Sequence, residues 1–202
     1  MQITNKTIAG SKVVFESIID EIPGGVSLVV ADLDYLVNNA NVDKRYLLKG
    51  TPVYVDIAAR TATVCKSAIA LASSSAQAIR VPKLNHFKVG ELLNDGVTSA
   101  EITGITTTVA TYDTIAVDAA LIYAEGTKYG EGSASGTSTA LYLTPNGLTK
   151  DDVFMGEGNA DVAVVTMGTA REAALSFPVN TLYKIALRGG TAGTGTSLIT
   201  FV

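Results

Sequence analysis

The stretch Tyr112-Asp-Thr-Ile-Ala-Val-Asp118 decides the fold class. Its larger apolar residues, Ile115 and Val117, are two positions apart, and smaller residues stand between and beside them. Successive side chains of a β-strand point to opposite faces, whereas a helix repeats its apolar residues every three or four positions. The alternation therefore predicts a strand with one face turned toward a core.

Short segments of the same kind continue on both sides of this stretch. They are rich in Val, Ile and Thr, and turns such as Pro23-Gly-Gly25 and Asn94-Asp-Gly96 separate them. Such spacing predicts a mainly β chain, folded as a small β-barrel or sandwich with long Gly/Ser/Thr-rich loops and at most short helices. The candidate strands are Val13–Phe15, Val26–Val30, Val53–Ile57, Ala62–Leu71, Ala78–Val81, Asn85–Val89, Glu101–Val109, Thr114–Val117, Leu121–Tyr123, Ala140–Leu143, Val162–Met167 and Leu198–Val202.

Other segments carry weaker signals. Ala170–Ser176 and Val179–Leu187 contain helix formers, but both are short and could equally be strands. Glu125–Thr139 and Pro145–Ala160 are rich in small and turn-forming residues, which predicts two surface loops.

The composition favours a packed chain with a protein partner. Of 202 residues, 47% are hydrophobic and only 17% charged, against about 25% in ordinary domains. The 19 glycines and many small residues suit close packing against a neighbour. A net charge of −4 and a pI near 5.0 argue against nucleic acid as a partner. No apolar run reaches the ~20 residues of a membrane span, and no signal peptide is evident at the N-terminus.

The residues that most often carry catalysis are scarce. His86 and Cys65 are the only histidine and cysteine, so one chain cannot build a Cys/His zinc site. We expect His86 to be a half-buried strand residue and Cys65 a buried, inert thiol. Gly190–Ser197 imitates a phosphate-binding loop, but Thr196 stands where the lysine is needed. No catalytic residue, cofactor or metal is expected, and the chain is not predicted to be an enzyme.

The loop carboxylates leave one alternative open. We expect them to be solvated, although Asn159-Ala-Asp161 near Glu157 could supply oxygen ligands to a structural ion. The other candidate acids are Asp32, Asp34, Asp113, Asp118, Asp151 and Asp152.

Two groups of segments resemble phage proteins. Leu48-Lys-Gly-Thr-Pro-Val-Tyr-Val-Asp56, followed by Ala62-Thr-Val-Cys-Lys-Ser-Ala-Ile69, resembles the β-hairpin openings of tailed-phage head decoration proteins. A second group is similar to a pattern in head fibre and auxiliary capsid proteins, notably from phages of gut Bacteroides-like bacteria. That group comprises His86-Phe-Lys-Val-Gly-Glu91, Glu101-Ile-Thr-Gly-Ile105 and Tyr112-Asp-Thr-Ile-Ala-Val117.

The resemblance implies a division of the chain into three parts. Residues 1–47 would form an N-terminal arm, 48–125 a β-barrel core, and 126–202 a loop-rich segment that completes this domain or forms a second small one. In the barrel Gly90 would turn the chain. The expected core residues are Phe87, Val89, Ile102, Ile105, Ile115 and Val117.

The resemblance also implies a function. The chain would be a structural virion protein on the outer surface of a phage capsid, made in the host cytoplasm and bound to the major capsid protein. It could also contact further copies of itself or other head fibre proteins. We expect Ile3, Ile8, Val13 and Phe15 in the N-terminal arm to contact the capsid. The alternative is a receptor-binding fibre or adhesin subunit that uses Glu125–Thr139 at its tip.

Overall fold

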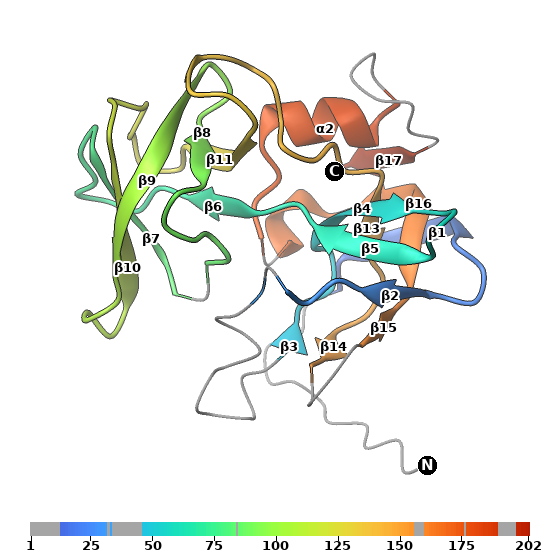
Figure 1. Cartoon of the computed structure of the whole chain (residues 1–202). Helices are drawn as coiled ribbons and strands as arrows, with labels where there is room; N and C mark the ends of the chain where they lie inside the picture. Colours follow the sequence, from blue (N-terminus) through green and yellow to red (C-terminus); the bar gives the residue numbers. More distant parts are fainter. Residues whose placement is uncertain are drawn as a thin grey trace.

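The protein is mainly β, as the sequence predicts, and the described part of the chain contains one short α-helix (Figure 1). A computed structural model describes residues 13–31, 33, 46–83, 85–155, 160–175, 177–189 and 197–202. Two large sheets lie side by side, and each has its own buried core.

The first sheet combines strands from both ends of the chain. Its strand order is β1-β16-β13-β4-β5-β2-β15, and β17 pairs in parallel with β16. The strands are β1 (Phe15–Glu21), β2 (Val26–Leu28), β4 (Pro52–Asp56), β5 (Thr61–Val64), β13 (Gly147–Thr149), β15 (Asp161–Val162), β16 (Val164–Ala170) and β17 (Leu198–Phe201). A small separate pair joins β3 (Tyr46–Leu47) to β14 (Val153–Phe154).

The second sheet is built from one continuous part of the chain. Its order is β6-β11-β8-β9-β10-β7, and β12 pairs with β9. The sheet curls into a partial barrel, because the main chains that continue its two edge strands meet: Leu71 N donates to Arg80 O at 2.8 Å. The strands are β6 (Ser67–Ile69), β7 (Ala78–Pro82), β8 (Leu92–Asn94), β9 (Thr98–Thr106), β10 (Tyr112–Val117), β11 (Lys128–Gly132) and β12 (Gly136–Thr137).

The alternating stretch forms β10 and fills the core of the second sheet. Ile115 and Val117 are buried there, which confirms the period-two pattern. Asp113 shares their face and is also fully buried, where its carboxylate pairs with Lys83 Nζ at 2.5 Å and accepts from Asn85 Nδ2 at 2.9 Å. The carboxylate of Asp113 can therefore be buried in this core, because it has an ion-pair partner and a hydrogen-bond donor.

Most of the predicted core residues lie where the sequence places them. Phe87 and Ile102 are buried with Ile115 and Val117, and Ile105 packs partly against them. The prediction for Val89 is wrong, because its side chain is 62% exposed. The reason is the turn at Gly90, whose φ of +90° carries the chain away just after Val89.

The predicted surface loop Glu125–Thr139 is also wrong in its middle. It contains β11 and β12, and residues 129–132 are buried. Its glycines serve close packing: a Cβ on Gly130 would lie 2.5 Å from Asn180 Nδ2, and one on Gly132 would lie 2.4 Å from Ser99 Oγ. Pro145–Ala160 similarly contains β13 and β14, with residues 156–159 outside the described part.

Several predicted elements have other boundaries. Asn85–Val89 and Leu121–Tyr123 are not strands, and Ala62–Leu71 divides between β5 and β6. Val179–Leu187 contains the helix α2 (Thr181–Leu187), which Asn180 caps by accepting from Tyr183 N at 2.8 Å. Ala170–Ser176 contains only the 3₁₀ turn η2 (Glu172–Ala174).

No helix among the described residues is long and apolar enough to cross a membrane.

Strand pairing divides the chain differently from the predicted three parts. Residues 52–64 belong to the first sheet, and β6 to β12 form the second. Beyond residue 126, β11 and β12 complete the second sheet, whereas β13 and β15 to β17 complete the first. The predicted barrel core 48–125 is therefore shared between two sheets.

We expect Ile115→Ala to lower the free energy of unfolding by about 3 kcal/mol, because it leaves a cavity in a fully buried site. Val89→Ala should change it by less than about 0.5 kcal/mol, since Val89 is exposed. Urea denaturation of both variants measures the difference. Equal losses would contradict the burial described for these two residues.

Candidate functional site

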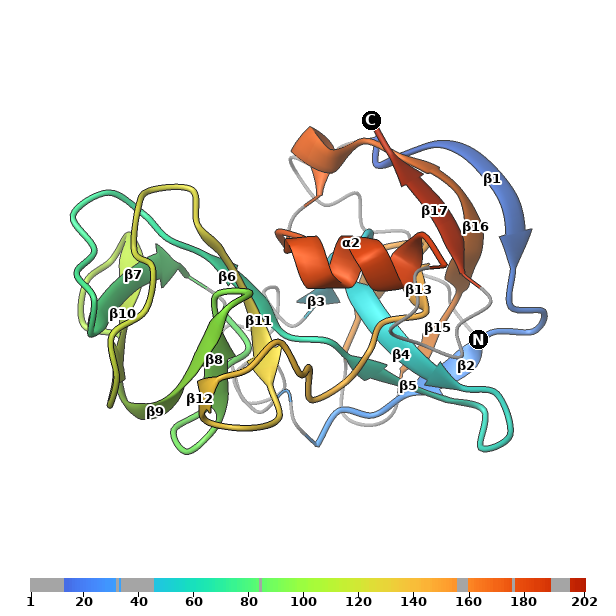
Figure 2. The ribbon, with the colours of Figure 1, turned by 90° about the horizontal axis from the view of Figure 1, so that it is seen from above.

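The two sheets join through a buried two-residue link. β5 ends at Val64 and β6 begins at Ser67, so Cys65 and Lys66 carry the chain from one sheet directly into the other (Figure 2). Both are almost fully buried. Cys65 N donates to Pro52 O at 2.9 Å, which fixes the link to β4 of the first sheet.

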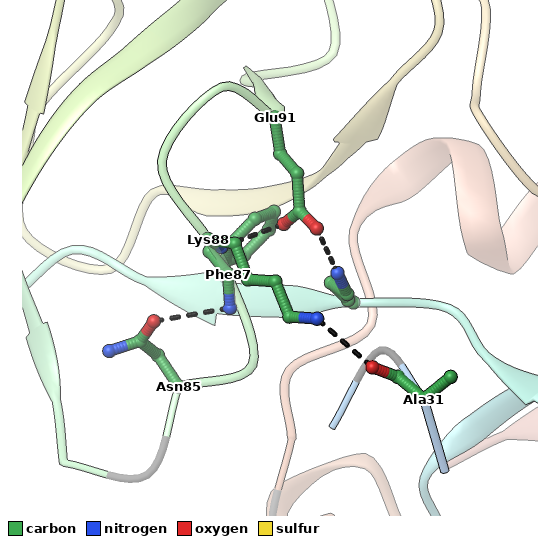
Figure 3. A network of polar contacts seen from close by, with 6 residues as sticks. Ala31, Asn85, Phe87, Lys88 and Glu91 are labelled. Atoms are coloured by element: carbon green, nitrogen blue, oxygen red, sulfur yellow. Dashed lines mark hydrogen bonds and ion pairs between the residues drawn. The ribbon is translucent and has the colours of Figure 1, made fainter. Parts of the chain in front are cut away.

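A polar network surrounds the Lys66 ammonium. This ammonium pairs with one oxygen of the Glu91 carboxylate. The second oxygen of Glu91 accepts from Lys88 N at 2.8 Å (Figure 3). The Lys88 ammonium in turn donates to Ala31 O at 3.1 Å, three residues beyond β2. Lys66 is 3% exposed and Glu91 20%, so both charges have lost much of their water and depend on each other. The network thus connects the second sheet to the first.

Tyr183 of α2 closes the same junction from another side. Its hydroxyl donates to Lys66 O at 2.9 Å and accepts from Glu131 N of β11 at 3.1 Å. Its ring lies against Gly130, where a Cβ would be 3.1 Å from Cζ. Burial raises the pKa of Tyr183, so the phenol keeps the proton that it donates. One hydroxyl therefore connects the helix, the link and β11.

The junction opens to solvent through a hollow of about 300 Å³. Carboxylates of Glu91 and Glu131 lie on its wall, and Glu91 already holds Lys66. Among the described residues no three His, Cys, Asp or Glu side chains gather as a metal site would need. The lining residues are Lys66, Gly90, Glu91, Leu92, Glu131, Gly132, Ser133 and Tyr142.

The single histidine and the single cysteine are both buried near this junction. His86 is buried and outside any strand, not half-buried in one as predicted, and its ring centroid is 4.4 Å from that of Phe177. Burial, and then the Lys66 charge, lower the pKa of His86 to about 3, so the imidazole is neutral at pH 7. Burial, and then Glu131, raise the pKa of Cys65, so its thiol stays protonated. The prediction of a buried thiol is confirmed.

Among the described residues, the predicted carboxylates do not converge. Asp113 is paired in the second core, whereas Asp118 Oδ1 accepts from Glu101 N at 2.8 Å. Asp152 accepts from Lys49 N at 2.8 Å, and Asp161 from Ser27 Oγ at 3.1 Å. Each of these stabilises its local main chain or sheet. Asp32, Asp34, Glu157, Asn159 and the phosphate-loop imitation at 190–196 lie outside the described residues.

The predicted capsid-contact residues are distributed unevenly. Ile3 and Ile8 lie outside the described residues, and Val13 is 65% exposed. Phe15 is half-buried and packs against the core that includes Val14 and Leu148, so only part of its ring is accessible. Val13 is therefore available for contact, whereas Phe15 contributes to folding.

The strand that follows these residues forms an exposed edge. In the described part of the chain β1 pairs only with β16, and it lies at the rim of the first sheet (Figure 2). Ile18 and Ile19 are 41% and 69% exposed. Ile18 and Ile19 are not among the contact residues predicted from the sequence, although two adjacent isoleucines among acidic residues indicate an exposed apolar strand.

A second apolar surface lies on the other sheet. The turn between β8 and β9 and the extended residues 120–124 border a groove of about 500 Å³. Ile122 and Tyr123 are about half exposed there, and Asp95 Oδ2 accepts from Ile122 N at 2.8 Å. Each sheet therefore presents exposed apolar residues within the described part of the chain.

Comparison with known proteins adds no relative. The chain matches no family model, no curated protein and no solved structure.

We expect Glu91→Gln to lower the free energy of unfolding by about 3 kcal/mol, because it leaves the Lys66 charge buried without its partner. Adding Lys66→Met should restore most of the loss. Urea denaturation of the single and double variants gives the coupling energy. The matched control is Glu101→Gln, an exposed carboxylate on β9, which should change stability by less than about 0.5 kcal/mol. Additive effects of the two junction changes would contradict the pairing.

We also expect stability to fall in acid through His86. Its pKa is lower in the folded chain than in the unfolded chain, so the unfolded state binds more protons and stability decreases as pH falls from about 6.5 toward 3. Between pH 6 and 4 the wild type should lose about 2 kcal/mol more than His86→Leu. Urea denaturation across that range measures both slopes, and equal slopes would contradict a buried neutral imidazole.

Proposed function

We propose that the protein is a non-enzymatic structural component of a phage virion that binds the outer surface of the capsid and decorates or stabilises it. Its partner is the major capsid protein, as the sequence resemblance implies. The observation that carries the proposal is the exposed β1 edge. The predicted contact residue Val13 is accessible there, and so are Ile18 and Ile19.

An edge of this kind favours a protein partner. Its free N–H and C=O groups can pair with another chain, and its exposed apolar side chains gain free energy when they are covered. Val13, Ile18 and Ile19 lie in one short segment, in which the exposed polar residues Glu16 and Ser17 separate Val13 from the two isoleucines. Exposed apolar residues at a sheet edge favour an interaction site.

The junction supports a mechanical role. A protein that reinforces a shell must transmit force between the parts that contact it. Here the two sheets share a buried link, an ion pair from Lys66 to Glu91 and the Tyr183 hydroxyl. These contacts oppose hinge motion at the link, so force applied at β1 reaches the second sheet.

The receptor-binding alternative has its own supporting feature. The groove beside Ile122 and Tyr123 offers an apolar and aromatic surface far from β1 in the sequence. The tip predicted for this alternative is shorter than expected, because within the Glu125–Thr139 segment only residues 125–126 and 133–139 are mainly exposed. A trimer in solution that presents these residues at one end would favour the alternative.

We expect the purified chain to co-sediment with capsids that lack it. The variant Ile3→Ser/Ile8→Ser/Val13→Ser should lose most of this binding, because it removes the predicted apolar contacts without disturbing the buried Val14. Val89→Ser is the control, since Val89 is about as exposed as Val13 but lies outside the first sheet. A wild-type chain that remains in the supernatant at capsid concentrations in the micromolar range would refute the proposal.

A further inference from the structure

We propose that the edge of β1 binds an extended, basic segment of the capsid partner, which adds to the first sheet as a further strand. This inference rests on the proposed function and specifies the chemistry of the partner. Two observations carry it: the direction of the main-chain groups on β1 and the charge of the strand. The irregular pairing of β1 with β16 limits the length of the added strand.

Main-chain groups at the start of β1 face outward. Val14 O accepts from Arg171 N at 2.8 Å, and Phe15 is opposite Ala170 in the ladder. In an antiparallel pair, residues that bond to the neighbouring strand alternate with residues whose N–H and C=O point the other way. The N–H and C=O of Phe15 therefore point toward the free edge, where an added strand can bond to them.

The strand carries a net negative charge. Glu16, Asp20 and Glu21 lie within its seven residues, and it contains no Lys or Arg. Glu16 pairs with Arg171 of the chain at 2.8 Å, and Glu21 pairs with Lys150 at 2.6 Å.

Asp20 differs from its two acidic neighbours. It is exposed and accepts from Thr166 Oγ1 at 3.3 Å, and it has no ion pair within the described chain. Its charge is thus available to a cation on an added strand.

The same charges disfavour a second copy of this chain as the occupant. If two β1 strands paired antiparallel over their full length, Glu16 of each copy would be opposite Asp20 of the other. A parallel pair in register would place each acid opposite itself. Like charges directly opposite one another on neighbouring strands are destabilising, whereas opposite charges contribute favourably. The edge therefore selects a foreign strand that carries Lys or Arg.

Irregular pairing limits how long the added strand can be. The register between β1 and β16 shifts between Phe15 and Ser17 and twice more before Glu21. Gly168 permits the close approach that accompanies these shifts, because a Cβ there would lie 2.4 Å from Ser17 O. Bulges twist an edge and interrupt its pairing, which protects against open-ended aggregation. The edge accordingly suits a short segment with apolar residues for Ile18 and Ile19 and a cation for Asp20.

The inference can be tested with defined peptides. The probes are acetylated six-residue peptides that alternate Lys with Val or Glu with Val, added to the full-length chain. The Lys/Val peptide should bind and slow hydrogen exchange at the Phe15 amide. Added salt should weaken the binding of this peptide. Asp20→Lys should weaken binding about tenfold. Glu125→Lys makes the same change of charge at an exposed residue in the turn before β11, and it should leave binding unchanged. Asp20→Asn should give an intermediate effect.

Capsid binding separates this inference from the proposed function. If the wild type co-sediments with capsids and Asp20→Lys does so equally well, with the Phe15 amide unprotected, the inference is wrong and the proposed function stands. If the wild type does not bind capsids, the proposed function is wrong, and the peptide experiment alone decides whether β1 takes a basic strand. Equal binding of the Lys/Val and Glu/Val peptides would overturn the inference in either case.

Discussion

The buried ammonium of Lys66 is the constraint on which the arrangement of the two sheets depends. An unpaired charge in that position would cost several kcal/mol, so the chain must bring Glu91 to it. Glu91 follows the Gly90 turn in the second sheet, and Lys66 follows β5 of the first. Meeting this requirement fixes how the curled sheet sits against its neighbour. Tyr183 then completes the junction by bonding to the Lys66 carbonyl.

Local patterns in the sequence predicted the strands better than their partners. Ile115 and Val117 could be placed because alternation depends only on neighbours in the chain. Val89 follows the same alternation but faces solvent, because the turn at Gly90 outweighs it. Gly130 and Gly132 appeared to belong to a loop, since only the folded chain shows that Asn180 and Ser99 occupy the space beside them. Contacts between distant segments leave little trace in local periodicity.

The candidate sites show the same division. The scarcity of reactive groups could be read directly, and the structure adds that His86 and Cys65 are both buried near the junction. The pairing of Lys66 with Glu91 could not be read, because 25 residues separate them. The β1 edge could be predicted only in part. The sequence indicated Val13 as a contact residue, but the place of β1 at the rim of the sheet depends on its pairing with β16, about 150 residues later in the chain. Edge and centre are properties of the whole sheet, not of one segment.

The second sheet is an insertion in the first, and this has a consequence for synthesis on the ribosome. Its strands come from residues 67–137 without interruption, so they can assemble as soon as that stretch has emerged. The first sheet must wait for β16 and β17 near the C-terminus, and β1 has no described partner strand until β16 is made. The newborn chain therefore carries a finished partial barrel beside an incomplete sheet with an uncovered apolar core.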